Sequence, residues 1–220
     1  MEDYFLTLVS PAEGYYMERG SKFLAYACPV ETEEEAHRFV LTIKKEHPKA
    51  RHYCMALRLF PDGSLERSND DGEPSGSAGR PILGQLVKNN LTNVCVVVVR
   101  YFGGTKLGIP GLIEAYKTST ANALKTGKII ERKVMTKILI KLSYESFPQF
   151  LNHFKQHDIP VFEESFGDRA SIIIWLPKSS VEENLLMAFH QLSQMDFNDL
   201  KHYTSYLGIE VDVLKGDVIF

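Results

Sequence analysis

Two glycine-rich segments of the chain carry the residues that are best suited to chemistry. The first, Asp70 to Gly79, reads DDGEPSGSAG and combines three carboxylates with glycine, serine and proline. The second, Gly103 to Lys106, reads GGTK and follows Arg100 at the end of an apolar run. Carboxylate oxygens bind divalent cations or move protons, whereas lysine, arginine and free backbone amides bind anions. The sequence therefore offers one acidic and one anion-attracting segment.

The GGTK segment lies between a predicted strand and a predicted helix. Val94–Val99 is β-branched almost throughout, which is typical of a strand buried on both faces. Pro110 suits the start of a helix whose apolar residues recur at helical spacing up to Gly127. A helix N-terminus attracts anions, although this segment lacks the GxxxxGK[ST] spacing of a phosphate loop. The candidate anion- or nucleic-acid-binding residues are Arg80, Arg100, Gly103, Gly104 and Lys106.

The acidic segment is a candidate metal or catalytic site. Asp70, Asp71 and Glu73 could hold a divalent cation, but their spacing does not match an EF-hand. We expect solvated carboxylates, with no metal and no cofactor. The loop serines and Cys54 show neither a nucleophile elbow nor triad spacing, so no catalytic residue is assigned.

Two further arrangements of the acidic segment remain open. The backbone amides of Ser75–Gly79 could form an anion nest at the start of the next helix, beside Arg80. Arg100 could instead pair with one of the three loop carboxylates and clamp the loop, because buried charges are normally paired.

Aromatic and histidine residues add weaker signals. Tyr101, Phe102 and Tyr116 could stack on nucleic-acid bases, although core packing explains most aromatic side chains. His153 and His157 lie four apart on a predicted helix, as a metal pair would, but the expected intervening glutamate is absent. We therefore expect a surface histidine pair.

The composition is that of an ordinary soluble protein. With 220 residues, 44% hydrophobic and 24% charged, the chain can bury one large core or two modest ones. No apolar run is long enough to cross a bilayer and the first residues do not resemble a signal peptide, so we expect a cytoplasmic protein with no membrane partner. The net charge of −3 restricts any nucleic-acid site to a local patch. Three widely spaced cysteines are expected to be buried free thiols.

Residues 1–130 are predicted to form an α+β domain. Apolar periodicity, capping residues and turn formers place its elements, and the segment Ser68–Gly79 has no large apolar residue and is a predicted loop. The predicted strands and helices are Tyr4–Val9, a hairpin over Tyr15–Val30, a helix from Thr32 to His47, a strand over His52–Phe60, a helix from Arg80 to Asn90, the strand at Val94 and the helix that ends at Gly127.

Residues 131–220 are predicted to form a second domain. Its elements are a strand at Ile138–Leu142, a helix at Phe147–Phe154, a hairpin of Ile159–Phe166 and Arg169–Leu176, a helix from Ser180 to about Gln194, and a last strand over Leu207–Val213. This βαββαβ order suits an antiparallel ferredoxin-like sheet backed by two helices.

Together the two segments resemble a known family. The loop DDGEPSGSAGRPIL, Asp70 to Leu83, followed by VVVVRYFGGTKLG, Val96 to Gly108, closely resembles the signature of the IMPACT family, including its bacterial YigZ-type members. One departure is Ser77, where the family more often has threonine and the hydroxyl is retained. The family-motif loop residues are Asp70, Asp71, Gly72, Glu73, Pro74, Ser77 and Gly79.

The resemblance implies a fold and a link to translation. It implies an N-terminal α+β domain of the ribosomal-protein type that is also seen in domain IV of elongation factor G, and a C-terminal domain similar to domain V of that factor. In eukaryotic relatives an additional region contacts a regulator of the amino-acid-starvation kinase. This sequence begins directly with the shared domain, so we expect a link to translation or nucleic acid by another route.

Two functional hypotheses follow. The first is a cytosolic, non-enzymatic protein that binds RNA or the ribosome, or a translation-associated protein partner, and influences translation or its regulation under stress. The alternative is a small-molecule hydrolase or transferase that uses the acidic glycine-rich loop. The absence of a complete catalytic constellation favours the first, and the oligomeric state is left open.

Overall fold

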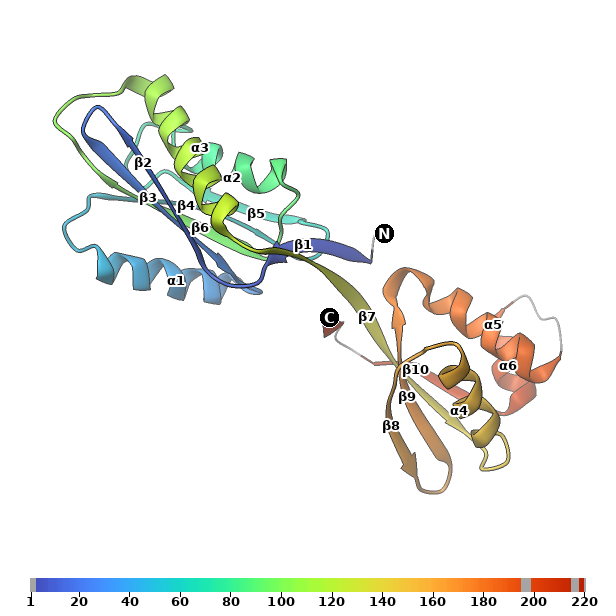
Figure 1. The fold of residues 1–220 in the computed structure, drawn as a ribbon. Helices are drawn as coiled ribbons and strands as arrows, with labels where there is room; N and C mark the ends of the chain where they lie inside the picture. The colour runs from blue at the N-terminus through green and yellow to red at the C-terminus, as the bar shows by residue number, and fades with distance from the viewer. Residues whose placement is uncertain (1–2, 195–198, 215–217, 220) are drawn as a thin grey trace. The chain divides into compact units, whose positions relative to one another are not determined.

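The chain folds into two compact units. The structure is a computed structural model that describes residues 3–194, 199–214 and 218–219. One unit comprises Tyr4–Arg132 and the other Lys133–Phe220 with the first three residues. Each unit combines helices with antiparallel strands, so the protein is of mixed α/β class (Figure 1). Whether residues 1–130 and 131–220 fold independently stays a prediction.

The Tyr4–Arg132 unit is built on a five-stranded antiparallel sheet. The strand order is β2-β3-β6-β4-β5, so that β6 lies in the centre. The strands are β2 (Ala12–Glu18), β3 (Ser21–Pro29), β4 (His52–Leu59), β5 (Leu65–Asn69) and β6 (Val94–Tyr101).

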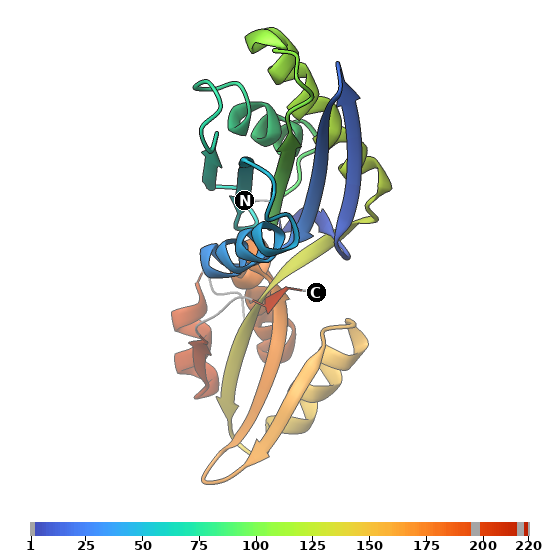
Figure 2. The ribbon, with the colours of Figure 1, turned by 90° about the vertical axis from the view of Figure 1, so that its left-hand side faces the viewer.

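Helices cover both faces of this sheet. Helix α1 lies on one face, and α2 and α3 lie on the other (Figure 1, Figure 2). Their bounds are α1 (Glu33–Glu46), α2 (Gly79–Lys88) and α3 (Gly108–Thr126). Thr32 caps α1, as its position in the sequence predicts, by accepting a hydrogen bond from the Glu35 amide at 3.1 Å.

The three-layer arrangement explains the unbroken apolar run of β6. The even-numbered residues of Val94–Val99 pack with α2 and α3, and the odd-numbered residues pack with α1. All six are fully buried. A strand with a helix on each face has no solvent side, so it shows no polar alternation. The prediction of a strand buried on both faces is confirmed.

Strand β5 was not predicted from the sequence. Its residues LERSN are polar after the leucine, and four of the five are exposed because β5 forms an edge of the sheet. A polar edge strand carries almost no periodic signal. The predicted loop over Ser68–Gly79 is therefore too long at both ends, since β5 ends at Asn69 and α2 begins at Gly79.

The second unit also centres on an antiparallel sheet. Strand β7 pairs with β9 and β10, and β9 pairs with β8, which gives the order β10-β7-β9-β8. Strand β11 also pairs with β7, which begins in the first unit, and so does β1, which belongs to the first unit. The bounds are β1 (Tyr4–Leu8), β7 (Ile129–Leu142), α4 (Phe147–Gln156), β8 (Val161–Phe166), β9 (Ala170–Pro177), α5 (Val181–Ser193), α6 (Leu200–Leu207), β10 (Glu210–Val213) and β11 (Val218–Ile219).

Helix α6 corrects the predicted last strand. The alternation that begins at Leu207 suggested a strand from that residue, but Leu207 is the last residue of α6 and the strand starts at Glu210. Asp199 caps this helix by accepting from the His202 amide at 2.9 Å, and Gly208 ends it in the left-handed region. The two capping residues thus set the bounds of α6, and the strand begins only after Gly208. Within the described residues, every helix falls short of the length and apolarity needed to span a membrane.

Candidate functional site

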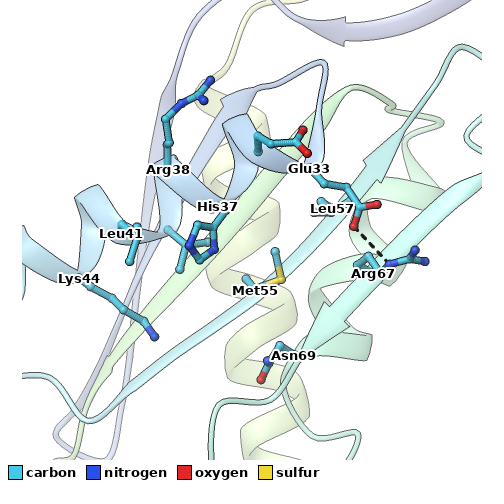
Figure 3. A pocket seen from close by; sticks show the side chains of 11 residues that line it. Glu33, His37, Arg38, Leu41, Lys44, Met55, Leu57, Arg67 and Asn69 are labelled. Carbon is cyan, nitrogen blue, oxygen red and sulfur yellow. Dashed lines mark ion pairs between the residues drawn. The ribbon is translucent and has the colours of Figure 1, made fainter.

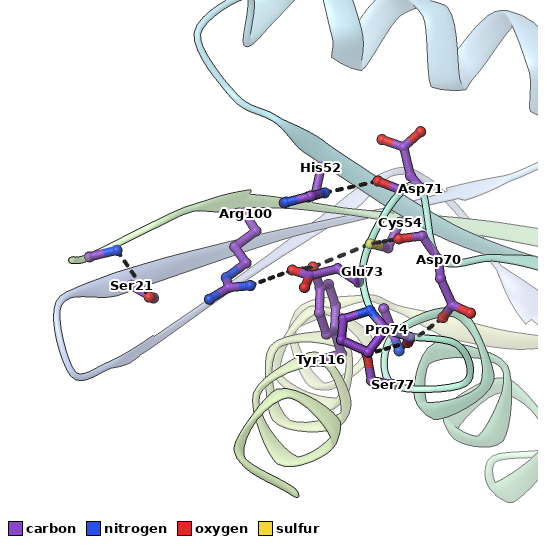
Figure 4. A network of polar contacts seen from close by, with 12 residues as sticks. Ser21, His52, Cys54, Asp70, Asp71, Glu73, Pro74, Ser77, Arg100 and Tyr116 are labelled. Atoms are coloured by element: carbon purple, nitrogen blue, oxygen red, sulfur yellow. Dashed lines mark hydrogen bonds and ion pairs between the residues drawn. The ribbon is translucent and has the colours of Figure 1, made fainter. Parts of the chain in front are cut away.

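The acidic loop folds back so that Asp70 caps helix α2 from inside the loop. One carboxylate oxygen accepts hydrogen bonds from the amides of Ala78 and Gly79 at 3.0 and 2.8 Å, and the other accepts from Gly76 at 2.8 Å (Figure 4). Burial raises the pKa of this carboxyl, but the three amides and the charge of Arg80 outweigh burial, so the pKa of Asp70 lies below its usual value. Asp70 is therefore held ionised.

This arrangement corrects the predicted anion nest. The nest over Ser75–Gly79 exists, but its anion is the side chain of Asp70 itself. The residue at the helix N-cap position, Ala78, has no side chain that could satisfy these amides. The sequence signal was ambiguous because an internal carboxylate and an external phosphate use the same amides.

Glu73 forms a buried ion pair with Arg100. A terminal nitrogen of the guanidinium donates to Oε1 of Glu73 at 2.6 Å, and the side chains of Arg100 and Glu73 are only 8% and 4% exposed. The hydroxyl of Tyr116 donates to the same oxygen at 2.9 Å. This is the clamp that the sequence left open as an alternative, and it ties the loop to β6 and α3.

Aromatic rings flank the guanidinium of Arg100. Its central carbon lies 5.5 Å from the ring centroid of Phe23 and 5.7 Å from that of Phe102. The Nε atom of Arg100 is buried and has no hydrogen-bond acceptor among the described residues. The guanidinium is therefore fixed by one carboxylate and two rings, and part of its donor capacity is unused.

Cys54 lies beneath the loop as a protonated thiol. Its Sγ atom is 3.0 Å from the carbonyl oxygen of Asp70 and 3.2 Å from the hydroxyl oxygen of Tyr116. Burial raises the pKa of Cys54 to about 12, and burial likewise raises the pKa of Tyr116. A thiol of this kind is not a nucleophile at neutral pH. Cys54 contributes packing and a weak donor to the loop.

Asp71 binds the neighbouring strand instead of converging with the other carboxylates. Its Oδ2 accepts from the amide of Tyr53 at 2.7 Å, and Nδ1 of His52 lies 2.9 Å from its carbonyl oxygen. Asp71 and Gly72 have φ values of 42° and 88°, so the tip of the loop turns through the left-handed region. Among the residues that the structure describes, no group of three His, Cys, Asp or Glu side chains is arranged to hold a metal ion.

The remaining motif residues shape the loop. The hydroxyl and the amide of Ser77 both bond to the carbonyl oxygen of Pro74, at 2.6 and 3.0 Å. A Cβ atom at Gly79 would lie 2.8 Å from the backbone nitrogen of Asn69, so only glycine fits between loop and strand. The hydroxyl at position 77 therefore has a structural role in the loop.

The GGTK turn is locked against the hairpin of β2 and β3. The amide of Gly103 donates to Oγ of Ser21 at 3.1 Å, and a Cβ atom at Gly103 would lie 1.9 Å from the carbonyl carbon of Gly20. Phe102 and Lys106 are exposed in this turn. Helix α3 starts just beyond it, and Leu107 at the N-cap position provides no side-chain hydrogen bond. Lysine and uncapped helix amides thus lie together in the chain, as predicted.

The five candidate anion-binding residues fall into three local environments. Arg80 is exposed beside Asp70, whose pKa its charge lowers. Arg100 is buried against Glu73. Gly103, Gly104 and Lys106 form the exposed turn before α3. Their role in binding an external anion stays a prediction, which the exposed turn suits better than the buried arginine.

A separate groove lies on the α1 side of the sheet (Figure 3). Its volume is about 690 Å³, and an ion pair of 3.4 Å between Glu33 and Arg67 crosses it. No motif in the sequence indicated it, and none of the candidate site residues lines it. The lining residues are Glu33, Glu34, His37, Arg38, Val40, Leu41, Lys44, Met55, Leu57, Arg67 and Asn69.

The histidine pair on α4 is only partly a surface feature. His153 is buried and its ring stacks on that of His157 with centroids 4.2 Å apart. Burial, and then the neighbouring His157, lower the pKa of His153. The expectation of two surface histidines is therefore wrong for His153, which faces the core because Phe150 and Phe154 bracket it on the helix.

Comparison with known proteins places the chain in a family. It is a two-unit mixed α/β protein, and residues 19–124 match the family model of the Impact N-terminal domain. It is 34% identical over 191 residues to IMPACT family member YvyE of Bacillus subtilis, covering 87% of this chain and 85% of the relative. It is 32% identical over 165 residues to IMPACT family member YigZ of Escherichia coli, covering 74% of this chain and 81% of the relative. The chain belongs to the IMPACT family.

A solved structure shares the fold over nearly the whole chain. It is a crystal structure described as a hypothetical protein, and it is 25% identical with a TM-score of 0.65. The match covers 98% of this chain and 99% of the other. The resemblance drawn from the two glycine-rich motifs is thus confirmed by sequence relatives, and the fold has a crystallographic counterpart.

Proposed function

We propose that the protein binds RNA, free or within the ribosome, at the turn between β6 and α3, and thereby influences translation in the cytoplasm. The chain belongs to the IMPACT family, and the motif resemblance to that family is what links it to translation. The observation that carries the proposal is the turn, anchored at Gly103, that presents Lys106 to solvent next to the uncapped N-terminus of α3. Phosphate groups bind to such amides and to lysine.

The acidic loop is compatible with a nearby anionic ligand. Two of its carboxylates are compensated internally, Asp70 by three backbone amides and Glu73 by Arg100. A compensated carboxylate repels a phosphate less than a free one, because its field is largely cancelled at short range. The same contacts favour binding over the hydrolase or transferase alternative, since the carboxylates of Asp70 and Glu73 are already engaged by backbone amides and by Arg100.

The finer assignments of the fold belong to this proposal. The antiparallel order β10-β7-β9-β8 in the second unit supports a ferredoxin-like assignment, related to domain V of elongation factor G. The three-layer first unit would correspond to domain IV of that factor. A translation-associated protein partner would fit the same role.

Lys106→Ala tests the proposal directly. Removing one phosphate contact should weaken RNA binding and make the slope of log affinity against log salt shallower by about 0.7 for single-stranded RNA, whatever its sequence. The melting temperature should not change, because Lys106 is exposed. Titrations of labelled RNA at several salt concentrations measure both quantities.

Lys88→Ala is the matched control. Lys88 is also exposed, but it ends α2 and precedes β6, whereas the turn follows β6. This variant should keep the wild-type affinity and salt slope. Equal affinity and slope for wild type and folded Lys106→Ala would refute the phosphate site.

A further inference from the structure

Resting on the proposed RNA-binding function, we propose that the turn takes single-stranded RNA specifically, with one base stacked on the exposed face of Phe102. The phosphate contacts alone would not distinguish single strands from duplexes. An exposed aromatic ring distinguishes them, because a base that is paired and stacked in a duplex has no free face on which the ring could stack. Phe102 is then a specificity-determining residue.

The structure separates the three aromatic residues near this turn. Tyr116 is fully buried, and the hydroxyl of Tyr101 lies 3.0 Å from Nδ1 of His47, in the layer under α1. Core packing accounts for both. Phe102 directly follows the central strand and is 58% exposed, although its ring also contacts the guanidinium of Arg100. Base stacking is the use that fits a phenyl ring in this position.

The inner side of the Phe102 ring is supported by a fixed cation. The guanidinium of Arg100 lies 5.7 Å from the ring centroid and is held by Glu73 at 2.6 Å. The same guanidinium lies 5.5 Å from the ring centroid of Phe23, which is fully buried. The exposed Phe102 ring therefore contacts a cation that itself contacts the core.

The backbone holds this platform in place before any ligand arrives. Gly103 follows Phe102 directly, and its close packing on Gly20 and its hydrogen bond to Ser21 fix the direction of the chain. A pre-organised ring loses little conformational entropy when a base stacks on it. Lys106 lies four residues further on, so base and phosphate contacts come from one short segment.

Phe102→Ala should weaken binding of single-stranded RNA by about 5- to 150-fold, the range reported for one base–aromatic stack at tenfold per 1.4 kcal/mol. The salt slope should stay at the wild-type value, because no phosphate contact is lost. Phe102→Trp should restore binding. Tyr15→Ala is the matched control, since Tyr15 is 48% exposed on β2 of the same unit and should be neutral.

The experiment uses the full chain, a fluorescein-labelled RNA without self-complementarity, and the same RNA annealed to its complement. Wild type should prefer the single strand, and Phe102→Ala should lose that preference while circular dichroism shows that it is still folded at the temperature of the titration. Wild-type affinity in Phe102→Ala, with weaker binding in Lys106→Ala, would overturn the stacking proposal and leave the phosphate site standing. Equal binding of single strand and duplex by wild type would also overturn it, and no binding of either RNA would overturn both proposals.

Discussion

Removing Glu73 should destabilise the Tyr4–Arg132 unit more than removing any exposed charge. In Glu73→Ala the guanidinium of Arg100 loses its carboxylate while it stays buried, because Phe23 and Phe102 still flank it. The hydroxyl of Tyr116 loses its acceptor at the same time. The cost therefore comes from an unpaired buried cation and from an unsatisfied hydroxyl.

The expected magnitude follows from the burial of the pair. Breaking a buried ion pair by removing one partner costs about 3–5 kcal/mol. A domain is stable by only about 5–15 kcal/mol, so this loss should lower the melting temperature by about 10–20 °C. Replacing both partners, as in Glu73→Leu with Arg100→Met, should recover most of the loss, because it removes the uncompensated charge as well as the pair.

The assay has to report on the correct unit. The single tryptophan, Trp175, is in β9 of the other unit, so tryptophan fluorescence would not follow this change. Circular dichroism melts of the full chain, with hydrogen exchange of the amides of Val94–Val99, report on the core that contains the clamp.

An exposed pair provides the reference. Arg67 and Glu33 lie 3.4 Å apart with side chains 57% and 48% exposed, so Arg67→Ala should change the free energy of unfolding by no more than about 1 kcal/mol. If Glu73→Ala costs no more than Arg67→Ala, the loop is not clamped by its ion pair. If the double variant is as unstable as Glu73→Ala alone, the loss does not come from an unpaired charge.

The remaining predictions concern single positions. The pKa of Asp70 is lowered on folding, so the ionised carboxylate stabilises the folded state at neutral pH, and this stabilisation is lost as the pH falls below the unfolded pKa of about 3.9. Asp70→Asn should therefore have a lower melting temperature than wild type at pH 7, and the difference should narrow below about pH 4. Burial raises the pKa of Cys54 and Cys95 to about 12, so a disulfide reagent at pH 8 should label them only on unfolding, as mass spectrometry would show. Gly103→Ala places a Cβ atom 1.9 Å from the neighbouring hairpin and should lower the melting temperature, whereas Gly84→Ala in α2 meets nothing within 4 Å and should raise stability by about 0.5–1 kcal/mol.

Sequence reasoning located the parts of the site but could not decide which charges pair. Val94–Val99 and Gly103-Gly104 carry strong local signals, since a doubly buried strand and a tight turn restrict the residue types they accept. The pairing of Arg100 with Glu73 depends on how the loop folds across the sheet, 27 residues away in sequence, and no periodicity encodes that. The edge strand β5 was missed for the related reason that solvent accepts almost any polar residue there.

The hydrogen bonds from the start of α2 to Asp70 also fix the number of residues in the loop. One carboxylate reaches the amides of residues six, eight and nine positions further on, so the chain between them has a fixed contour length. Surface loops usually accommodate insertions at small entropic cost, because closure depends only weakly on length. The loop that Asp70 closes should not tolerate insertions, since an added residue would separate the carboxylate from its amides and leave the first amides of α2 without acceptors. Variation in length should therefore be confined to turns such as Pro61–Ser64, outside the segment that Asp70 closes.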